Sequence, residues 1–329
     1  MLIHKKNSES LDYEFACDVK EGLERTKKKI KSKYFYDHIG SQLFEKICLQ
    51  PEYYLTRTEL AMLDKYSREI MKLHDHHHIS ILELGSGSST KTRIMLKCIL
   101  KKQNQLYYFP IDISHTILYE AADKLSNEFS GLYTIGIFSD YIEGVRKVSD
   151  LISSKDDIPK TKLILFLGSS IGNFEPKEAI SFFRAIRARM ENHDSFLVGF
   201  DLHKDPKILE AAYNDKAGIT AKFNLNILAR INRDLGGKFD LGAFSHYSFY
   251  NENKKRIEMY LISKNNQKVH IHGIGKTFTF KENERIHTEN SYKYTLEQIR
   301  LLAKESNFKV KGNFIDEKKW FDLALLSPA

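Results

Sequence analysis

The sequence predicts an α/β protein with a doubly wound, mainly parallel sheet and a second, discontinuous domain. Short apolar runs alternate with helical stretches through residues 79–200, which is typical of strand–helix–strand units. The first apolar run ends in a glycine-rich turn, and open α/β sheets bind ligands at such turns. Two extended runs near the C-terminus, 307–315 and 320–326, are predicted to form a hairpin that closes the sheet.

Five apolar runs are predicted to be the parallel strands, namely residues 79–84, 106–113, 132–137, 162–167 and 195–200. Helical patterns lie between several of them, at residues 91–100, 118–129 and 176–190. Strands that are joined by helices in this way pair in parallel, because the chain must cross back to the same end of the sheet.

Two stretches interrupt this alternation. Residues 1–56 precede the first strand and are predicted to be helical, with aromatic residues at intervals. Residues 204–290 open with a helical, Asn-rich run and continue with β-like segments at 246–251, 256–263 and 276–280. These two stretches are therefore predicted to form the second domain.

The composition indicates a folded protein and bears on its partners. Of the 329 residues, 42% are hydrophobic and 12% aromatic, which is enough for a substantial core. The net charge of +8 raises the question of nucleic acid. However, the lysine clusters, such as 27–29 and 254–256, lie far apart and no nucleic-acid-binding motif accompanies them. We therefore expect a solvated basic surface and no nucleic-acid partner.

The chain is expected to be a cytoplasmic monomer that does not bind membranes. Its cysteines, Cys17, Cys48 and Cys98, are widely spaced and form no disulfide framework. No apolar run approaches the roughly 18 residues of a membrane span, and the N-terminus lacks a signal-peptide core. Residues 76–78 are histidines, but no Cys or carboxylate stands at ligand spacing, so no metal site is predicted.

The glycine-rich turn predicts an adenosine-binding site. Gly85 and Gly87 follow the strand 79–84, and glycine permits a tight turn and a close approach of ligand to backbone. Asp112 ends the next strand, 25 residues after Gly87, where a carboxylate suits two ribose hydroxyls. Nicotinamide dehydrogenases and methyltransferases that use S-adenosylmethionine (SAM) share this layout.

Two details favour SAM over a nicotinamide cofactor. Thr90 stands at the third glycine of the G-x-G-x-x-G motif, and a ligand without phosphate does not need that helix N-terminus as an anion site. The late strands and the C-terminal hairpin are also typical of a class I (Rossmann-like) methyltransferase sheet. Asp140 and Tyr141, after the third strand, stand where an acid would meet the adenine amino group.

Further segments carry a more specific resemblance, and they are residues 34–44, 51–59, 168–174, 212–215, 256–259 and 286–291. Taken together and in order, they resemble the histidine-specific, SAM-dependent methyltransferases, the family of the L-histidine Nα-methyltransferases of ergothioneine biosynthesis. The resemblance runs from about residue 15 to the C-terminus. Leu55 departs from the family pattern, in which proline is expected after the paired tyrosines, and we expect this change to loosen the loop.

The resemblance implies three methyl transfers from SAM to the α-amine of histidine, which give hercynine (trimethylhistidine). It also implies a SAM-binding core over residues 57–203 and 291–329, and a substrate-binding domain over 1–56 and 204–290. The expected cofactor-binding residues are Tyr36, Gly85, Gly87, Lys91, Asp112, Asp140 and Tyr141. The expected substrate-binding residues are Phe44, Tyr53, Gly168, Asn173, Tyr213, Thr220, Met259, Glu289 and Ser291. Tyr36 and Tyr53 are also expected to act in catalysis.

These residue types suit the implied reaction. Methyl transfer is an in-line displacement, so alignment of the reactants matters more than acid–base catalysis. Asn173 is a neutral donor for an amino-acid head group, while Glu289 and Ser291 suit the two nitrogens of an imidazole. The aromatic faces of Tyr36 and Tyr53 would attract a methylated, cationic nitrogen by about 0.5–2 kcal/mol.

Three alternatives remain open at this point. Relatives of this family methylate indole amino acids, although Glu289 and Met259 favour a histidine-type pocket. The charge of +8 motivates an RNA methyltransferase. A SAM-binding sensor without catalytic activity is a third possibility, against which Lys91, Asp112 and Asn173 argue.

Overall fold

The computed structural model describes residues 2–4, 8–72 and 78–329, which form two compact units. The first unit contains Leu55–His203 and Lys293–Ala329 together with the short strand Leu2–His4. The second unit contains residues 8–54 and 204–292. The chain therefore passes from one unit to the other between residues 4 and 8 and again after residues 54, 203 and 292.

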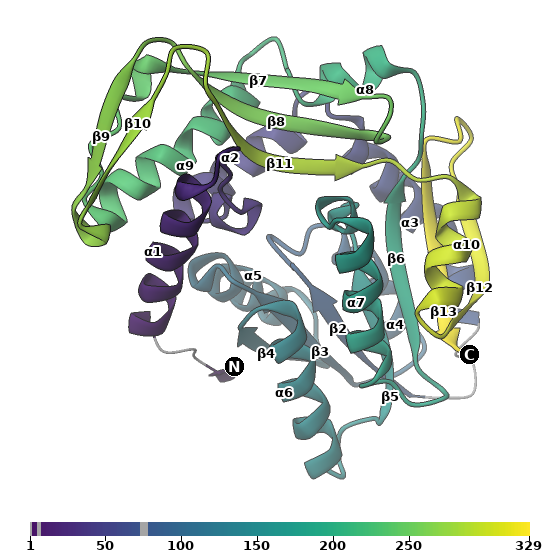
Figure 1. Ribbon diagram of the computed structural model, residues 1–329. Coiled ribbons are helices and arrows are strands. Elements are labelled where there is room, and N and C mark those ends of the chain that lie inside the picture. The colour runs from purple at the N-terminus through teal and green to yellow at the C-terminus, as the bar shows by residue number, and fades with distance from the viewer. Residues whose placement is uncertain (1, 5–7, 73–77) are drawn as a thin grey trace. The chain divides into compact units, whose positions relative to one another are not determined.

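The strands of the first unit are β1 (Leu2–His4), β2 (Ile79–Leu84), β3 (Leu106–Asp112), β4 (Leu132–Phe138), β5 (Thr161–Phe166), β6 (Ser195–Asp201), β12 (Phe308–Ile315) and β13 (Phe321–Pro328). They form one sheet in the order β1-β4-β3-β2-β5-β6-β13-β12 (Figure 1). Strands β1 to β6 pair in parallel, whereas β13 is antiparallel to both β6 and β12. The order reverses between β2 and β5, so the carboxyl ends of these strands are where such a sheet binds its ligand.

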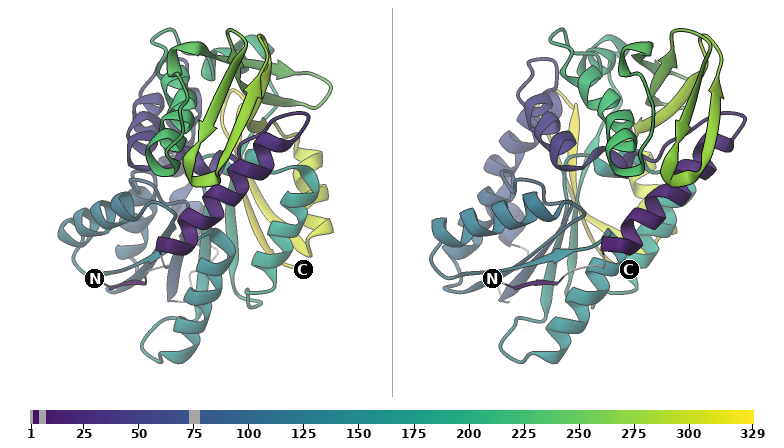
Figure 2. Two further views of the ribbon diagram at one scale, coloured as in Figure 1. Left: turned by 60° about the vertical axis from the view of Figure 1, so that its left-hand side comes forward. Right: turned by 90° about the vertical axis from the view of Figure 1, so that its left-hand side faces the viewer.

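Helices cover both faces of this sheet (Figure 2). They are α3 (Tyr54–Lys72), α4 (Thr92–Leu100), α5 (His115–Glu128), α6 (Tyr141–Ser154), α7 (Pro176–Arg187) and α10 (Leu296–Glu305). Apolar side chains of α3, α4 and α5 form one buried core with the sheet, and those of α6, α7 and α10 form the other. Strands that are buried on both faces in this way read as continuous apolar runs rather than as alternating ones.

The predicted α/β fold class is confirmed, and so are the five parallel strands and the C-terminal hairpin. The prediction that residues 1–56 contain only helices is wrong, because Leu2–His4 pairs in parallel with β4. A strand of three residues is too short to show a periodic pattern. Residues 291 and 292 were predicted to belong to the core, but they continue a strand of the second unit.

The second unit combines helices with antiparallel strands. Its helices are α1 (Ser8–Glu24), α2 (His38–Cys48), α8 (Pro206–Ala212) and α9 (Ile219–Leu235), with short 3-10 turns at η1 (Ser32–Phe35), η3 (Leu241–Ala243) and η4 (His272–Ile274). Its strands are β7 (Phe244–Asn251), β8 (Arg256–Ser263), β9 (Gln267–Ile271), β10 (Lys276–Phe280) and β11 (Arg285–Tyr292). They form a three-stranded sheet, β11-β8-β7, and a β9–β10 hairpin. Within this unit α9 packs against α2 and β7.

In the described part of the chain, no helix combines the length and the apolar character that crossing a membrane requires.

Candidate active site

The glycine-rich turn after β2 has a backbone that requires glycine. Gly85 and Gly87 both have positive φ, +71° and +48°, which is the left-handed region that favours glycine. The backbone N–H of Gly85 donates to the carbonyl of Ile111 at 2.8 Å, so the turn is held against the end of β3. A Cβ on Gly85 would lie 3.1 Å from the Tyr141 hydroxyl, while a Cβ on Gly87 would meet nothing within 4 Å. The backbone at Gly87 is therefore open to a ligand.

Asp112 connects the end of β3 to this turn. Its Oδ2 accepts the backbone N–H of Gly87 at 2.9 Å, and its Oδ1 accepts that of Ser114 at 2.8 Å. Burial raises the pKa of the carboxyl, and the backbone donors at Gly87 and Ser114 act in the opposite direction. A carboxylate offers about four lone-pair sites, so the two backbone bonds leave capacity for ribose hydroxyls. Asp112 thus fits the adenosine-containing cofactor that the sequence predicts.

Asp140 and Tyr141 begin α6. Asp140 is exposed, and its Oδ1 caps the helix by accepting the backbone N–H of Glu143 at 3.1 Å. The Tyr141 ring packs against Phe166 with a centroid distance of 5.3 Å. Burial raises the pKa of the Tyr141 phenol, and the charge of nearby Asp112 raises it further. Tyr141 therefore lies close to both Asp112 and the turn at Gly85.

Lys91, Gly168 and Asn173 also lie in the first unit. Lys91 directly precedes α4, and its Nζ lies 2.6 Å from the buried Oε2 of Glu59. Gly168 follows β5 with φ of +78°, and a Cβ there would lie 3.1 Å from the Lys91 Nζ. Asn173 ends the short 3-10 turn η2 (Ser170–Asn173), so it is not the N-cap of a helix.

Aromatic residues of the second unit form a continuous row. Tyr36 contacts Phe44 with a centroid distance of 5.6 Å, and Phe44 contacts Tyr53 at 6.1 Å. Tyr53 in turn contacts Tyr213 at 6.2 Å. Phe223 of α9 lies against both Tyr36 and Phe44, at 5.8 and 6.0 Å. The rings are mostly edge-on or tilted, which is the favourable geometry for aromatic pairs.

Polar residues of β11 continue this row. The Tyr213 hydroxyl lies 2.7 Å from the Ser291 hydroxyl, and both side chains are buried. Glu289 stands two positions before Ser291 and therefore shares its face of the strand. Met259 of β8 lies opposite Glu289 in the register, next to a bulge between His287 and Glu289.

The pKa of Tyr53 reflects its burial and these neighbours. Burial raises the pKa of the Tyr53 phenol well above its ordinary value, and neighbouring Tyr213, Cys48, Tyr36 and Glu289 raise it further. The phenol is consequently protonated at neutral pH. It can donate a hydrogen bond but is not available as a general base.

Thr220 lies at the start of α9, close to Asp215. The backbone N–H of Thr220 donates to Asp215 Oδ1 at 2.7 Å, and that of Ile219 donates to Oδ2 at 2.8 Å. Burial acts to raise the pKa of Asp215, but the bonds from Thr220 and Ile219 outweigh it and hold the pKa below its ordinary value. Asp215 therefore fixes the N-terminal turn on which Thr220 stands.

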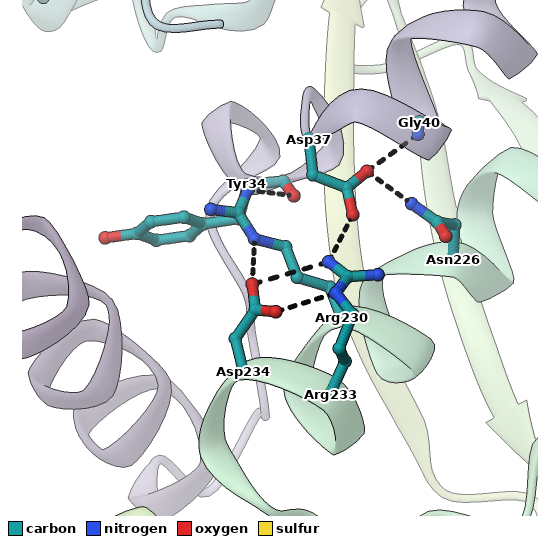
Figure 3. Close-up of polar contacts among 7 residues, drawn as sticks. All are labelled: Tyr34, Asp37, Gly40, Asn226, Arg230, Arg233 and Asp234. Carbon is teal, nitrogen blue, oxygen red and sulfur yellow. Dashed lines mark hydrogen bonds and ion pairs between the residues drawn. The ribbon is translucent and has the colours of Figure 1, made fainter. Parts of the chain in front are cut away.

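A polar cluster that the sequence did not predict holds α2 against α9 (Figure 3). Asp37 Oδ1 accepts the backbone N–H of Gly40 at 2.7 Å and the Asn226 amide at 2.8 Å, while its Oδ2 pairs with Arg233 at 2.5 Å. Gly40 admits no side chain, because a Cβ would lie 1.7 Å from the Phe35 carbonyl oxygen. The position of Asp37 directly after Tyr36, at a helix start, was the available signal.

The predicted site residues thus fall into two groups. Those in the first unit are Gly85, Gly87, Lys91, Asp112, Asp140, Tyr141, Gly168 and Asn173, and among them Gly85 lies near Tyr141, Gly87 near Asp112, and Lys91 near Gly168. Those in the second unit are Tyr36, Phe44, Tyr53, Tyr213, Thr220, Met259, Glu289 and Ser291, and, Thr220 aside, each of them lies next to another member of the group. Tyr36, predicted to bind the cofactor, belongs to the second group, and Gly168 and Asn173, predicted to bind the substrate, belong to the first.

Among the residues that the structure describes, no cluster of three His, Cys, Asp or Glu side chains is placed to hold a metal ion. His76 and His77 of the histidine run, where the sequence predicts no metal site, lie outside the described residues.

The strand order with its reversal, the antiparallel strand β13, the glycine turn and the acid at the end of β3 are those of a class I methyltransferase sheet. The model of the histidine-specific, SAM-dependent methyltransferases matches residues 15–328. The chain belongs to this family.

Individual relatives agree with this assignment. The chain is 37% identical to the histidine N-alpha-methyltransferase of Mycobacterium tuberculosis, over 84% of this chain and 83% of the relative. It is 34% identical to the enzyme of the same name from Mycolicibacterium smegmatis, over 94% and 93%. It is also 31% identical to ergothioneine biosynthesis protein 1 of Schizosaccharomyces pombe, over 89% of this chain but 38% of that longer protein.

Proposed function

We propose that this protein transfers methyl groups from SAM to the α-amine of L-histidine, in three steps that yield hercynine for ergothioneine biosynthesis. The observation that carries the proposal is the buried group of Tyr213, Glu289 and Ser291 in a member of the histidine-specific family. SAM supplies a methyl group on a sulfonium sulfur, and the protein's residues must bind and align the two reactants.

We assign the recognition of the imidazole to Glu289 and Ser291. A carboxylate accepts from one ring N–H, and a hydroxyl can donate to or accept from the other nitrogen. Both residues are buried, at 8% and 3% exposure. A substrate whose side chain cannot hydrogen-bond to them therefore binds more weakly, because their polar groups are left without a partner and away from water. Such sites reject analogues more strongly than apolar pockets do. Met259, opposite Glu289, and Thr220 would shape the apolar part of the pocket.

We assign the α-amino-acid group of the substrate to Tyr213 and Asn173, with Gly168 and Phe44 shaping the pocket. The protonated phenol of Tyr53 would donate a hydrogen bond to the substrate, and the rings of Tyr53 and Tyr36 would stabilise the substrate nitrogen as it becomes cationic. Neither phenol removes a proton in this proposal. Alignment and cation–π attraction are the contributions we assign to them.

For SAM, we assign the ribose to Asp112 and the close backbone approach to Gly85 and Gly87. The open position at Gly87 and the carboxylate geometry of Asp112 support this assignment. Asp140 and Tyr141 would bind the adenine, and Lys91 the methionyl carboxylate, which is the anionic group of SAM. Tyr36 would complete the binding of the cofactor.

Incubation with SAM and single amino acids, followed by mass spectrometry, tests this function. Each transfer replaces a hydrogen by a methyl group and adds about 14 Da, so we expect histidine to gain roughly 14, 28 and 42 Da in turn. The trimethylated product should accumulate. Tryptophan and unmodified tRNA in parallel reactions represent the indole and RNA alternatives. Methylation of tryptophan or tRNA in place of histidine would contradict the proposal.

We also infer that the enzyme acts as a monomer in the cytoplasm. Cys17, Cys48 and Cys98 are free thiols, which is typical of proteins from a reducing compartment. Light scattering after size exclusion should give the mass of one chain, 38.3 kDa. A mass of two chains would contradict the monomer.

A further inference from the structure

Glu59 of α3 is a completely buried carboxylate to which no role has yet been assigned. Its exposure is 0%, and glutamate is almost never buried to this extent unless it is paired. Its partners are Lys91, which we assign to SAM, and Gly168, which we assign to the substrate pocket. Glu59 ends the segment 51–59, which carries part of the family resemblance, but its role depends on partners that are distant in the chain.

The first partner of Glu59 is the ammonium of Lys91, at 2.6 Å from Oε2. The second is the backbone N–H of Gly168, at 2.9 Å from each carboxylate oxygen. A third element also approaches closely, since a Cβ on Gly199 of β6 would lie 2.3 Å from Oε1. One carboxylate therefore fixes the start of α4 and the loop after β5, and it packs against β6.

The loop after β5 needs such an anchor because of its backbone. Gly168 and Ser169 are consecutive residues with positive φ, +78° and +56°, and a non-glycine residue in this region is uncommon. The Ser169 hydroxyl accepts the backbone N–H of Asp201 at 2.9 Å, which holds the far side of the loop. Glu59 holds the near side through Gly168 and, with the same group, restricts Lys91.

We propose that Glu59 is a positioning residue for SAM binding, which acts by holding the Lys91 ammonium in place for the methionyl carboxylate and by fixing the Gly168 loop. This inference rests on the proposed function, because Lys91 is assigned to the cofactor there. A lysine ammonium on a flexible four-carbon chain loses much of its freedom on binding. An ion pair that already restricts it lowers this cost.

The substitution Glu59→Gln separates the two contacts of the carboxylate. The amide oxygen of glutamine still accepts the Gly168 N–H. Its NH₂ group, however, faces the Lys91 ammonium, and two donors form no hydrogen bond with each other. Lys91 is therefore expected to leave its position. Calorimetric titration of the apoprotein should show at least tenfold weaker binding of SAM than the wild type.

S-adenosylhomocysteine is the second probe, because it shares the carboxylate and ribose of SAM but lacks the sulfonium charge. If Glu59 acts through Lys91, Glu59→Gln should weaken both ligands by similar factors. Weakening of SAM alone would mean that the Glu59 charge acts on the sulfonium, and it would overturn the proposal. Unchanged or tighter binding of both ligands would overturn it too.

Asp194→Asn provides a matched control in the same unit. Asp194 is also buried at 0% exposure, pairs with Lys162 at 2.9 Å and accepts two backbone N–H bonds, but it lies at the amino ends of β5 and β6. The substitution Asp194→Asn should lower the melting temperature, because it leaves the buried Lys162 charge without its partner. It should leave the affinity for SAM unchanged. Equal loss of SAM affinity in Asp194→Asn and Glu59→Gln would show a general effect of unfolding and overturn the positioning role.

A double variant keeps the test decisive if Glu59→Gln alone does not fold. Glu59→Gln with Lys91→Met removes both charges and leaves no buried charge unpaired. It should bind SAM as weakly as Lys91→Met alone, and a further tenfold loss would contradict an action through Lys91. Absence of SAM binding by the wild-type protein would instead reject the proposed function itself.

Discussion

The hydroxyl oxygens of Tyr213 and Ser291 lie 2.7 Å apart, although 78 positions separate the two residues in the sequence. Tyr213 follows α8 and Ser291 lies near the end of β11. Two further bonds fix Tyr213, since His246 and Ser248 both contact its carbonyl oxygen at 3.0 Å. Strand β11 and the loop after α8 are thus joined at the point where we place the histidine substrate.

Substitution of Ser291 by alanine should weaken histidine binding about tenfold, since a buried hydroxyl bond contributes roughly 0.5–1.5 kcal/mol and Tyr213 loses its own partner. SAM affinity should not change. Calorimetry with each ligand measures both effects. Ser181→Ala, at an exposed helical position, is the matched control, and equal histidine affinity in the two variants would reject the role of Ser291.

Glu289→Ala should abolish measurable histidine binding while SAM binding persists. The carboxylate is buried and is the acceptor that we assign to an imidazole N–H, so its loss leaves that donor unpaired. Glu289→Gln keeps an acceptor and should cost about tenfold instead. Titration with histidine and tryptophan measures specificity, and unchanged histidine affinity in Glu289→Ala would contradict the assignment.

Asp37→Ala should lower the free energy of unfolding by about 2–3 kcal/mol, because α2 loses its cap and the Asn226 amide loses its acceptor. Arg233→Met leaves the cap and the Asn226 bond in place, removes the ion pairs of Arg233 with Asp37 and Asp234, and should cost under about 1 kcal/mol, since Arg233 is 45% exposed. Urea denaturation of both variants tests the difference. Equal destabilisation would mean that the ion pair, not the cap, holds this cluster together.

The fold could be predicted where a strand is buried on both faces, and less well elsewhere. Residues 79–84 are all buried and all but two are apolar, so the strand is visible in the sequence. In β11, Thr288 to Ser291 are polar and equally buried, and such a run reads as surface. Only tertiary pairing with β8 shows that it is a strand of a sheet.

The candidate site shows the same division between local and distant contacts. Gly85 and Asp112 could be predicted, because a turn after a strand and an acid at the next strand's end are local features. Glu59 could not, since its contact with Gly168 spans 109 positions. The same holds for Asp37 and Asn226, which are 189 positions apart. The ligand assignments drawn from the family resemblance remain predictions.

The last prediction concerns Glu83, which lies at the end of β2 beneath the glycine turn. Burial raises the pKa of this carboxyl to about 7, although hydrogen bonds from Thr92 and Tyr108 act to lower it. The unfolded chain releases this proton near its ordinary value of 4.5. Between pH 4.5 and 7 folded Glu83 therefore keeps a proton that the unfolded chain releases, and this residue alone should lower the free energy of unfolding by about 3 kcal/mol as the pH rises.

Glu83→Gln should remove this fall, because the amide does not titrate and still serves Thr92 and Tyr108. Chemical denaturation at roughly pH 5, 6, 7 and 8 measures how steeply the free energy of unfolding changes with pH in the wild type and in each variant. Burial also raises the pKa of Asp322 to about 7, so Asp322→Asn should remove a separate part of the fall. If Glu83→Gln kept the full slope of the wild type while Asp322→Asn lost it, the proton would reside on Asp322 alone. Glu83 would then be ionised beneath the turn throughout this range.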